Sequence, residues 1–158
     1  VDRLRSIRAV DASHHFTLVC RDLAQISQYA RVDNQQYRLL RAATPGSYTF
    51  ILHASCEVPK RLQNAKRKTI GLRVPGHPVV QDLLTELGEP LLSSTLILPG
   101  DDVPLNDAAA IRERLEHSVD LVLDGGSCGL TMTTVIDLTG ATPQIVREGK
   151  GSLDVLGL

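Results

Sequence analysis

The stretch KTIGLRVPGHPVVQDLLTELGEPLLSSTLILPG (68–100) decides the fold class. Residues 68–75 alternate between polar and apolar side chains up to a proline, which predicts a β-strand. In residues 79–87 the apolar side chains recur at i, i+1, i+4, i+5 and i+8, which predicts an amphipathic helix that Gly88 caps. The apolar run 90–98 predicts a second strand. A strand, a helix and another strand in succession indicate an α/β fold.

The flanking sequence extends this pattern in both directions. Upstream, strands are predicted at 15–20 and 47–54, and helices at 21–30, from the N-cap Asp33, and from Pro59 toward Lys66. Downstream, a helix capped by Asn106 or Asp107 precedes three predicted strands, at 119–126, 133–138 and 143–149. Helices separate the early strands and short turns separate the late ones, so we expect a mixed parallel and antiparallel sheet flanked by helices. With no linker or repeat, residues 1–158 are predicted to form a single domain.

Composition excludes several classes of protein. The chain has 158 residues, of which 42% are hydrophobic and only 3% aromatic, so the core must consist of Leu, Ile, Val and Ala. Its net charge of -1 gives no overall attraction to nucleic acid or membranes. No apolar stretch approaches the roughly 20 residues of a spanning helix, and VDRLRSIR (1–8) does not resemble a signal peptide, which predicts a cytoplasmic protein and no membrane partner. Three scattered cysteines indicate neither a disulfide framework nor a zinc site, and Cys20 is interpreted as a core residue.

A basic segment stands out against this neutral background. Residues 59–75 contain no acidic side chain but carry six basic ones: Lys60, Arg61, Lys66, Arg67, Lys68 and Arg73. A solvated connection between a helix and a strand would explain the segment, and so would contacts with phosphate or RNA. The sequence leaves both explanations open.

Two groups of polar residues lie within otherwise apolar strands. Ser93, Ser94 and Thr95 interrupt the predicted strand 90–98, where they either satisfy one another or face a ligand. Thr133, Thr134 and Asp137 precede Arg147, which could reach the same pocket if their strands are antiparallel neighbours. Otherwise Arg147 would form a surface ion pair with Glu148 or Asp137. Together with the basic segment, these residues predict a site for a phosphate-bearing ligand, a nucleotide above all.

In order along the chain, TPGSYTFIL (44–52), residues 66–100, TTVIDLT (133–139) and VREG (146–149) resemble the YrdC-type threonylcarbamoyl-AMP synthase family, most closely its YciO branch. The resemblance covers nearly the whole chain. It implies a YrdC-like (RibB-like) fold with a twisted mixed sheet around a positively lined concavity. It also implies condensation of ATP, L-threonine and bicarbonate into threonylcarbamoyl-AMP and diphosphate for tRNA modification, with Mg²⁺ accompanying ATP, and binding of tRNA or double-stranded RNA.

The resemblance also assigns roles to individual residues. Those implied to contact the nucleotide are Arg8, Thr69, Thr95 and Arg147. Those implied to hold threonine are Arg73, Ser93 and Thr133, with Arg73 facing the carboxylate. Candidates for RNA contacts are Lys60, Arg61, Lys66, Arg67 and Lys68. No catalytic side chain and no metal ligand is assigned.

Two departures from the family pattern limit the expected activity. A Lys-x-Arg pair of the synthases reads Arg8-Ala9-Val10 here, and a Ser-x-Asn pair reads Thr95-Leu96-Ile97. The family's leading strand and helix do not precede Val1, so we expect either a fragment or a natural deletion, without synthase activity if the chain is complete. Weak or altered synthase activity is therefore expected. The alternatives are a module that binds double-stranded RNA or tRNA, and a regulatory domain that binds a nucleotide without turnover.

Overall fold

The computed structural model describes residues 1–157. Its α-helices are α1 (Asp2–Arg8), α2 (Leu23–Tyr29), α3 (Asn34–Ala43), α4 (Pro78–Leu87) and α5 (Ala108–Leu115). Its strands are β1 (Thr17–Val19), β2 (Tyr48–His53), β3 (Thr69–Arg73), β4 (Leu91–Ser93), β5 (Thr134–Asp137) and β6 (Gln144–Arg147). Two short 3-10 helices are η1 (Lys60–Leu62) and η2 (Asp154–Leu156).

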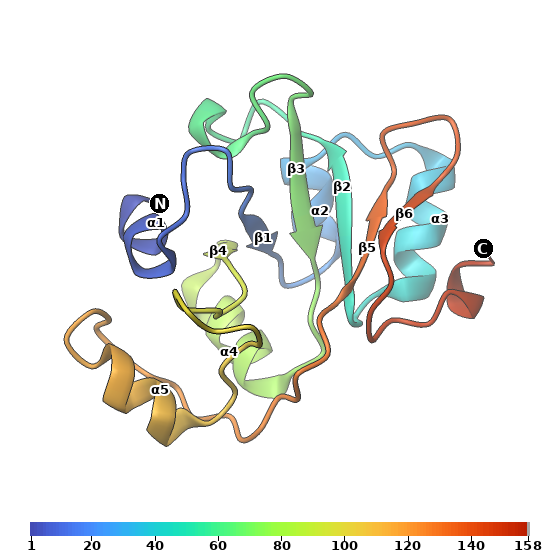
Figure 1. The fold of residues 1–158 in the computed structure, drawn as a ribbon. Helices are drawn as coiled ribbons and strands as arrows, with labels where there is room; N and C mark the ends of the chain where they lie inside the picture. The colour runs from blue at the N-terminus through green and yellow to red at the C-terminus, as the bar shows by residue number, and fades with distance from the viewer. Residues whose placement is uncertain (158) are drawn as a thin grey trace. The chain divides into compact units, whose positions relative to one another are not determined.

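The six strands form one mixed sheet in the order β4-β1-β3-β2-β5-β6 (Figure 1). β1 is parallel to β3 and β2 is parallel to β5, whereas the other neighbouring pairs are antiparallel. The predicted α/β class and mixed sheet are therefore confirmed. β5 and β6 pair antiparallel, which is the condition under which Arg147 was expected to reach Thr133.

The chain divides into two compact units. The sheet unit comprises His15–Ser93 together with the C-terminal part from Met132, and it contains all six strands with α2, α3 and α4. The α1–α5 unit comprises Val1–His14 and Ser94–Thr131. A single domain spanning residues 1–158 stays a prediction.

Helix ends follow the capping residues in the sequence. The Asp33 side chain accepts a hydrogen bond from the Gln36 backbone N–H (2.8 Å), and the Gln36 side chain accepts one from the Asp33 N–H (2.9 Å), which forms a capping box. Gly88 ends α4 in the left-handed conformation, at φ 70°, as predicted. Asp107, rather than Asn106, caps α5 by accepting a hydrogen bond from the Ala110 N–H at 2.8 Å.

The core lies on one face of the sheet, where apolar strand residues pack with residues of α2 and α3. Its largest fully buried side chains include Phe50, Leu52, Leu72, Ile26 and Leu40. Aliphatic side chains dominate, as the composition requires. Cys20 is fully buried, and burial raises the pKa of its thiol to about 12, so its predicted place in the core is confirmed.

Two predicted strand segments are wrong. The strand predicted for 90–98 ends at Ser93, which pairs with Thr17 at the start of β1, so the ladder has no further partner residue. Residues 119–126 form no strand, and their Leu121 and Leu123 side chains are 71% and 53% exposed. An apolar run forms a strand only where a neighbouring strand accepts its hydrogen bonds. Across residues 1–157, no helix has both the length and the apolar surface to cross a membrane.

Candidate anion-binding site

The side of the sheet opposite the core carries polar residues. Leu18, Leu72 and Phe50 point into the core, so their neighbours along each strand point to the other face, because side chains alternate along a strand. On this polar face lie Thr17 and Ser93, Thr69, Gly71 and Arg73, Thr49, and Arg147. Seven residues were predicted to contact ATP or threonine. Five of them lie in the sheet unit and on this one face: Thr69, Arg73, Ser93, Thr133 and Arg147.

Arg73 has an unusual environment for a charged group. Its side chain is half-buried, and its Nε atom is buried with no hydrogen-bond partner among the described residues. No carboxylate within residues 1–157 forms an ion pair with it. Burial lowers the pKa of the guanidinium. Since a buried donor without a partner costs free energy, a bound anion at Arg73 would be favourable.

Arg147 is held by the backbone rather than by an acid. Its Nε and Nη2 atoms donate to the carbonyl oxygen of Thr133 at 3.2 and 2.9 Å. The alternative ion pair with Asp137 or Glu148 is wrong, because Asp137 pairs instead with Arg67 at 2.6 Å. Arg147 therefore lies where the sequence predicted, beside Thr133, and keeps its positive charge available for a ligand.

A pair of threonine hydroxyls lies between the strands that carry the two arginines. Thr49 Oγ1 and Thr133 Oγ1 are 2.9 Å apart, and Arg147 Nη2 lies 3.4 Å from Thr133 Oγ1. Because Phe50 pairs with Leu72, Thr49 is the cross-strand neighbour of Arg73. Sequence reasoning missed Thr49, although a single threonine within the run YTFIL (48–52) was a signal for it.

The other predicted contacts of the sheet unit lie beside this group. The Ser93 hydroxyl donates to the carbonyl oxygen of Thr17 at 3.1 Å. Thr69 is buried at the start of β3, four residues before Arg73, which corresponds to about 13 Å along a strand. Between them, a Cβ atom at Gly71 would lie 3.2 Å from Thr17 Oγ1, so the Thr17 side chain packs closely over this glycine.

Arg8 and Thr95 belong to the α1–α5 unit. Arg8 Nε donates to the carbonyl oxygen of Ile97 at 2.7 Å, and Nη1 donates to the Thr95 carbonyl and the Ser94 hydroxyl. These bonds attach the end of α1 to the segment after β4. Their assignment as nucleotide contacts stays a prediction.

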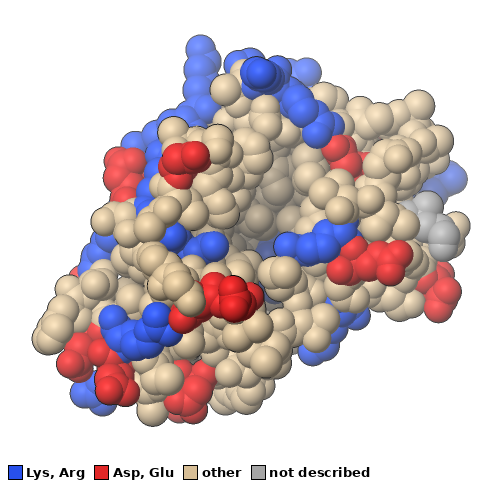
Figure 2. Space-filling view, in the orientation of Figure 1, with Lys and Arg blue, Asp and Glu red and all other residues tan. Residues whose placement is uncertain are grey.

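The basic loop, residues 59–68, connects β2 to β3. All five predicted RNA contacts in it are exposed, and basic side chains gather over this end of the sheet unit at the top of Figure 2. The Asn64 side chain shapes the turn by accepting hydrogen bonds from the Lys66 and Arg67 N–H groups at 3.0 and 2.9 Å. Arg67 differs from the rest, because it donates to Asp137 and Thr139, each at 2.6 Å. Four of the five cations are thus without an acidic partner in the described chain.

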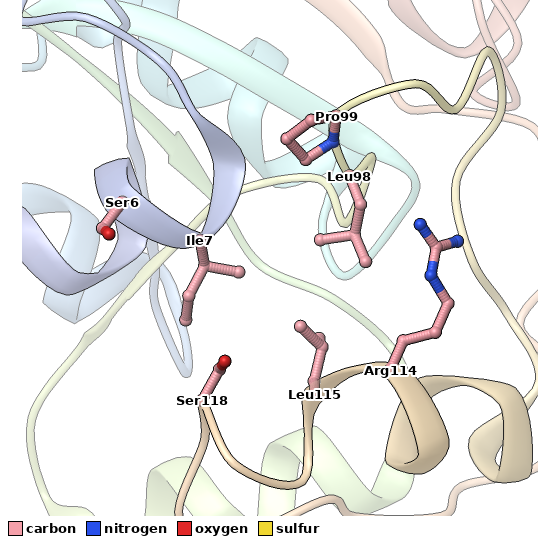
Figure 3. A pocket seen from close by; sticks show the side chains of 7 residues that line it. All are labelled: Ser6, Ile7, Leu98, Pro99, Arg114, Leu115 and Ser118. Carbon is pink, nitrogen blue, oxygen red and sulfur yellow. The ribbon is translucent and has the colours of Figure 1, made fainter.

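A separate pocket of about 400 Å³ lies in the α1–α5 unit (Figure 3). It is lined by Ser6, Ile7, Leu98, Pro99, Arg114, Leu115 and Ser118. The charge of Arg114 is neutralised by Asp101, whose carboxylate oxygens are 2.8 and 3.1 Å away. No predicted site residue lines this pocket. Nor do three His, Cys, Asp or Glu side chains gather into a metal site anywhere in the part of the chain that the structure describes.

Comparison with known proteins gives one family. The model of the Sua5, YciO and YrdC proteins, described as "Telomere recombination", matches residues 1–149. YciO of Escherichia coli is 52% identical over 153 residues, which cover 97% of this chain and 74% of that protein. A threonylcarbamoyl-AMP synthase of Vibrio vulnificus is 27% identical over 128 residues, covering 79% of this chain and 68% of the synthase.

Solved structures agree with the sequence comparison. The crystal structure of E. coli YciO matches 98% of this chain and 75% of its own, with a TM-score of 0.91 and 51% identity. P. abyssi Sua5 complexed with L-threonine matches 94% of this chain and 44% of its own, with a TM-score of 0.84 and 22% identity. At 22% identity, the match to Sua5 shows only that the two chains share a fold.

Proposed function

The chain belongs to the Sua5, YciO and YrdC family, and from this premise we propose that it binds L-threonine and ATP on the polar face of its sheet and forms threonylcarbamoyl-AMP slowly. The observation that carries the proposal is the pair Arg73 and Arg147, two guanidinium groups on one face without carboxylate partners among the described residues. Relatives named for this chemistry and a Sua5 complex with L-threonine support the same ligands.

The two arginines suit the two anionic ends of the ligands. Arg73 would bind the threonine carboxylate, because a guanidinium matches a carboxylate with two parallel hydrogen bonds. Arg147 would bind the phosphates, where its charge opposes the negative charge that develops on the phosphoryl oxygens. Thr69, Thr95 and Arg8 remain proposed nucleotide contacts, and Ser93 and Thr133 remain proposed threonine contacts.

The proposed reaction has two steps. The amine of threonine and bicarbonate form a carbamate with loss of water, and a carbamate oxygen then attacks the α-phosphorus of ATP. The bond from that phosphorus to the β-phosphate oxygen breaks, and diphosphate leaves. Mg²⁺ would accompany ATP and would neutralise part of the phosphate charge during the displacement.

The slow rate follows from two apolar residues in the sequence. The family resemblance implies that Val10 and Ile97 stand where the synthases carry Arg and Asn. A hydrogen bond to a charged group contributes on the order of 1.5 to 3 kcal/mol, so the loss of two such groups weakens stabilisation of the triphosphate in the transition state.

Calorimetry and a diphosphate assay test this proposal. The Arg73→Ala variant is expected to bind L-threonine roughly 10- to 100-fold more weakly, with ATP affinity unchanged, because only the carboxylate contact is lost. Arg41→Ala, an exposed arginine of α3, is the matched control and should bind normally. The wild-type protein with ATP, L-threonine and bicarbonate should release diphosphate.

Three outcomes decide between the candidate functions. Absence of threonine binding in the wild-type protein contradicts the proposed ligand. Binding of ATP with no diphosphate release favours a regulatory nucleotide-binding role. Equal threonine affinity in Arg73→Ala and Arg41→Ala removes Arg73 from the site.

The basic loop supports binding of tRNA or double-stranded RNA as a second function. Four exposed cations without acidic partners in the described chain are suited to phosphate contacts, whereas Arg67 is engaged by Asp137. The triple variant Lys60→Ala, Arg61→Ala, Lys66→Ala should weaken RNA binding and lower the slope of log affinity against log salt by about 0.7 to 0.9 per lost contact. Arg38→Ala with Arg41→Ala on α3 is the control, and an unchanged slope in the triple variant argues against RNA binding through this loop.

A further inference from the structure

The hydroxyl pair Thr49–Thr133 has one hydrogen-bond donor more than the described residues use. We propose that Thr133 donates to Thr49 and that the hydrogen of the Thr49 hydroxyl binds an oxygen of the anionic ligand held by Arg73, which makes Thr49 a ligand-binding residue. The inference rests on the proposed function, since it concerns the same ligand, and it adds a contact that residue-by-residue resemblance did not assign.

The count of hydrogens comes from the partners of the two hydroxyls. Thr49 Oγ1 and Thr133 Oγ1 share one hydrogen bond, so one of their two hydrogens lies between them. The further contact of Thr133 Oγ1 is with Arg147 Nη2, and a guanidinium only donates. No acceptor for the second hydrogen is found in residues 1–157. One hydroxyl hydrogen therefore remains for a ligand, whichever threonine donates to the other.

Burial makes this spare donor significant. Thr49 is only 8% exposed, so bulk water solvates its hydroxyl poorly. A buried polar group without a partner costs roughly 1 to 3 kcal/mol, and native structures rarely keep one without a use. Arg73 Nε is a second buried donor, and it has no partner at all among the described residues.

The register of the sheet places the Thr49 hydroxyl next to the Arg73 side chain. Phe50 pairs with Leu72, so Thr49 and Arg73 are cross-strand neighbours on the same face, with Cβ atoms about 4.5 to 5.5 Å apart. An anion on the Arg73 guanidinium would lie within reach of the hydroxyl pair. Arg147 polarises the pair from its other side, because its positive charge lies next to Thr133 Oγ1.

Three variants test the inference by calorimetry with L-threonine. Thr49→Val keeps the shape of the side chain and removes its hydroxyl, so threonine affinity should fall about tenfold or more. Thr49→Ser retains the hydroxyl and should bind within about threefold of the wild-type protein. Thr85→Val removes a hydroxyl that bonds only to the carbonyl of Gln81 on α4 and should leave affinity unchanged.

The outcomes separate this inference from the proposed function. If the wild-type protein binds threonine and Thr49→Val binds it equally well, the inference is wrong and the proposed function stands. If the wild-type protein does not bind L-threonine, both the inference and the proposed threonine site are overturned. If Thr49→Val and Thr49→Ser lose affinity alike while both keep the wild-type melting temperature, the hydroxyl is not the group that matters, and the inference falls.

Discussion

Four arginines of this chain differ in their hydrogen-bond partners. Arg8 bonds to backbone carbonyls, and Arg67 pairs with Asp137. Arg147 is aligned by the Thr133 carbonyl, and Arg73 has no partner for its buried Nε among the described residues. Of these four arginines, only Arg67 pairs with a carboxylate, so the positive charges of the other three are not neutralised by an ion pair among the described residues.

The contribution of the Arg67–Asp137 ion pair to stability can be tested through its pH dependence. Burial by itself raises the pKa of Asp137, but hydrogen bonds from Thr139 and Arg67 outweigh it, so the pKa lies below its ordinary value. A depressed native pKa means that the stabilisation is present above the unfolded pKa of about 3.9 and is lost as pH falls through the native pKa.

Asp137→Asn should therefore lower the free energy of unfolding at pH 7, by on the order of 1 to 2 kcal/mol, with a smaller difference from wild type in acid. Urea unfolding at a series of pH values measures this. Asp120→Asn is the control, because Asp120 pairs with Arg3 at the same 2.6 Å while 87% exposed, and exposed pairs contribute little. A difference between wild type and Asp137→Asn that stays constant down to pH 2 would contradict the account.

At the scale of elements, the segment after β6 fixes the position of Arg147. The Thr134 hydroxyl donates to the Gly151 carbonyl at 2.7 Å and accepts from the Gly149 N–H at 3.0 Å. The Tyr48 hydroxyl donates to the Ser152 carbonyl at 2.7 Å. This close approach needs glycine, since a Cβ atom at Gly151 would lie 2.4 Å from the Tyr48 ring.

Gly151→Ala should accordingly lower the melting temperature, because the buried Tyr48 ring would have to move and overpacking costs about 1 to 3 kcal/mol. Gly140→Ala is the matched control, since its Cβ atom would meet only the Thr142 carbonyl at an ordinary 3.6 Å. Calorimetric melting of both variants gives the comparison. Equal melting temperatures would show that the segment does not pack as described.

At the scale of the whole molecule, the two units differ in how much apolar surface they bury. The hydrophobic core belongs entirely to the sheet unit. In the α1–α5 unit, Leu98 and Leu115 are the buried apolar side chains among the described residues. Local stability follows buried apolar contacts, so the α1–α5 unit should open at lower free energy.

Hydrogen exchange measures this difference. Amides of α1 and α5 should exchange roughly tenfold faster, or more, than amides of β2 and β3 under native conditions. The exchange of α2 and α3, which pack on the core, serves as the internal comparison. Uniform exchange across all helices and strands would mean that the units unfold together.

Local patterns in the sequence were sufficient for most of the fold. Apolar periodicity and capping residues predicted α3, α4 and α5 and the strands β2, β3, β5 and β6, because these signals act within a few residues. They failed at 94–98 and 119–126, where an apolar run has no strand to pair with. Whether a partner strand exists is a property of the tertiary structure.

The sequence by itself singled out Arg73, Thr133 and Arg147 among its charged and hydroxylated residues, and its resemblance to a known family implied a role for each. Only the tertiary structure decided which of these groups have partners. In the folded chain Arg67 pairs with Asp137, seventy residues away, and Thr49 forms a hydrogen bond with Thr133. Arg73 Nε has no partner in the described chain. The physical reason is that strand order and register set distances between residues far apart in sequence, and hydrogen bonds form only at those distances.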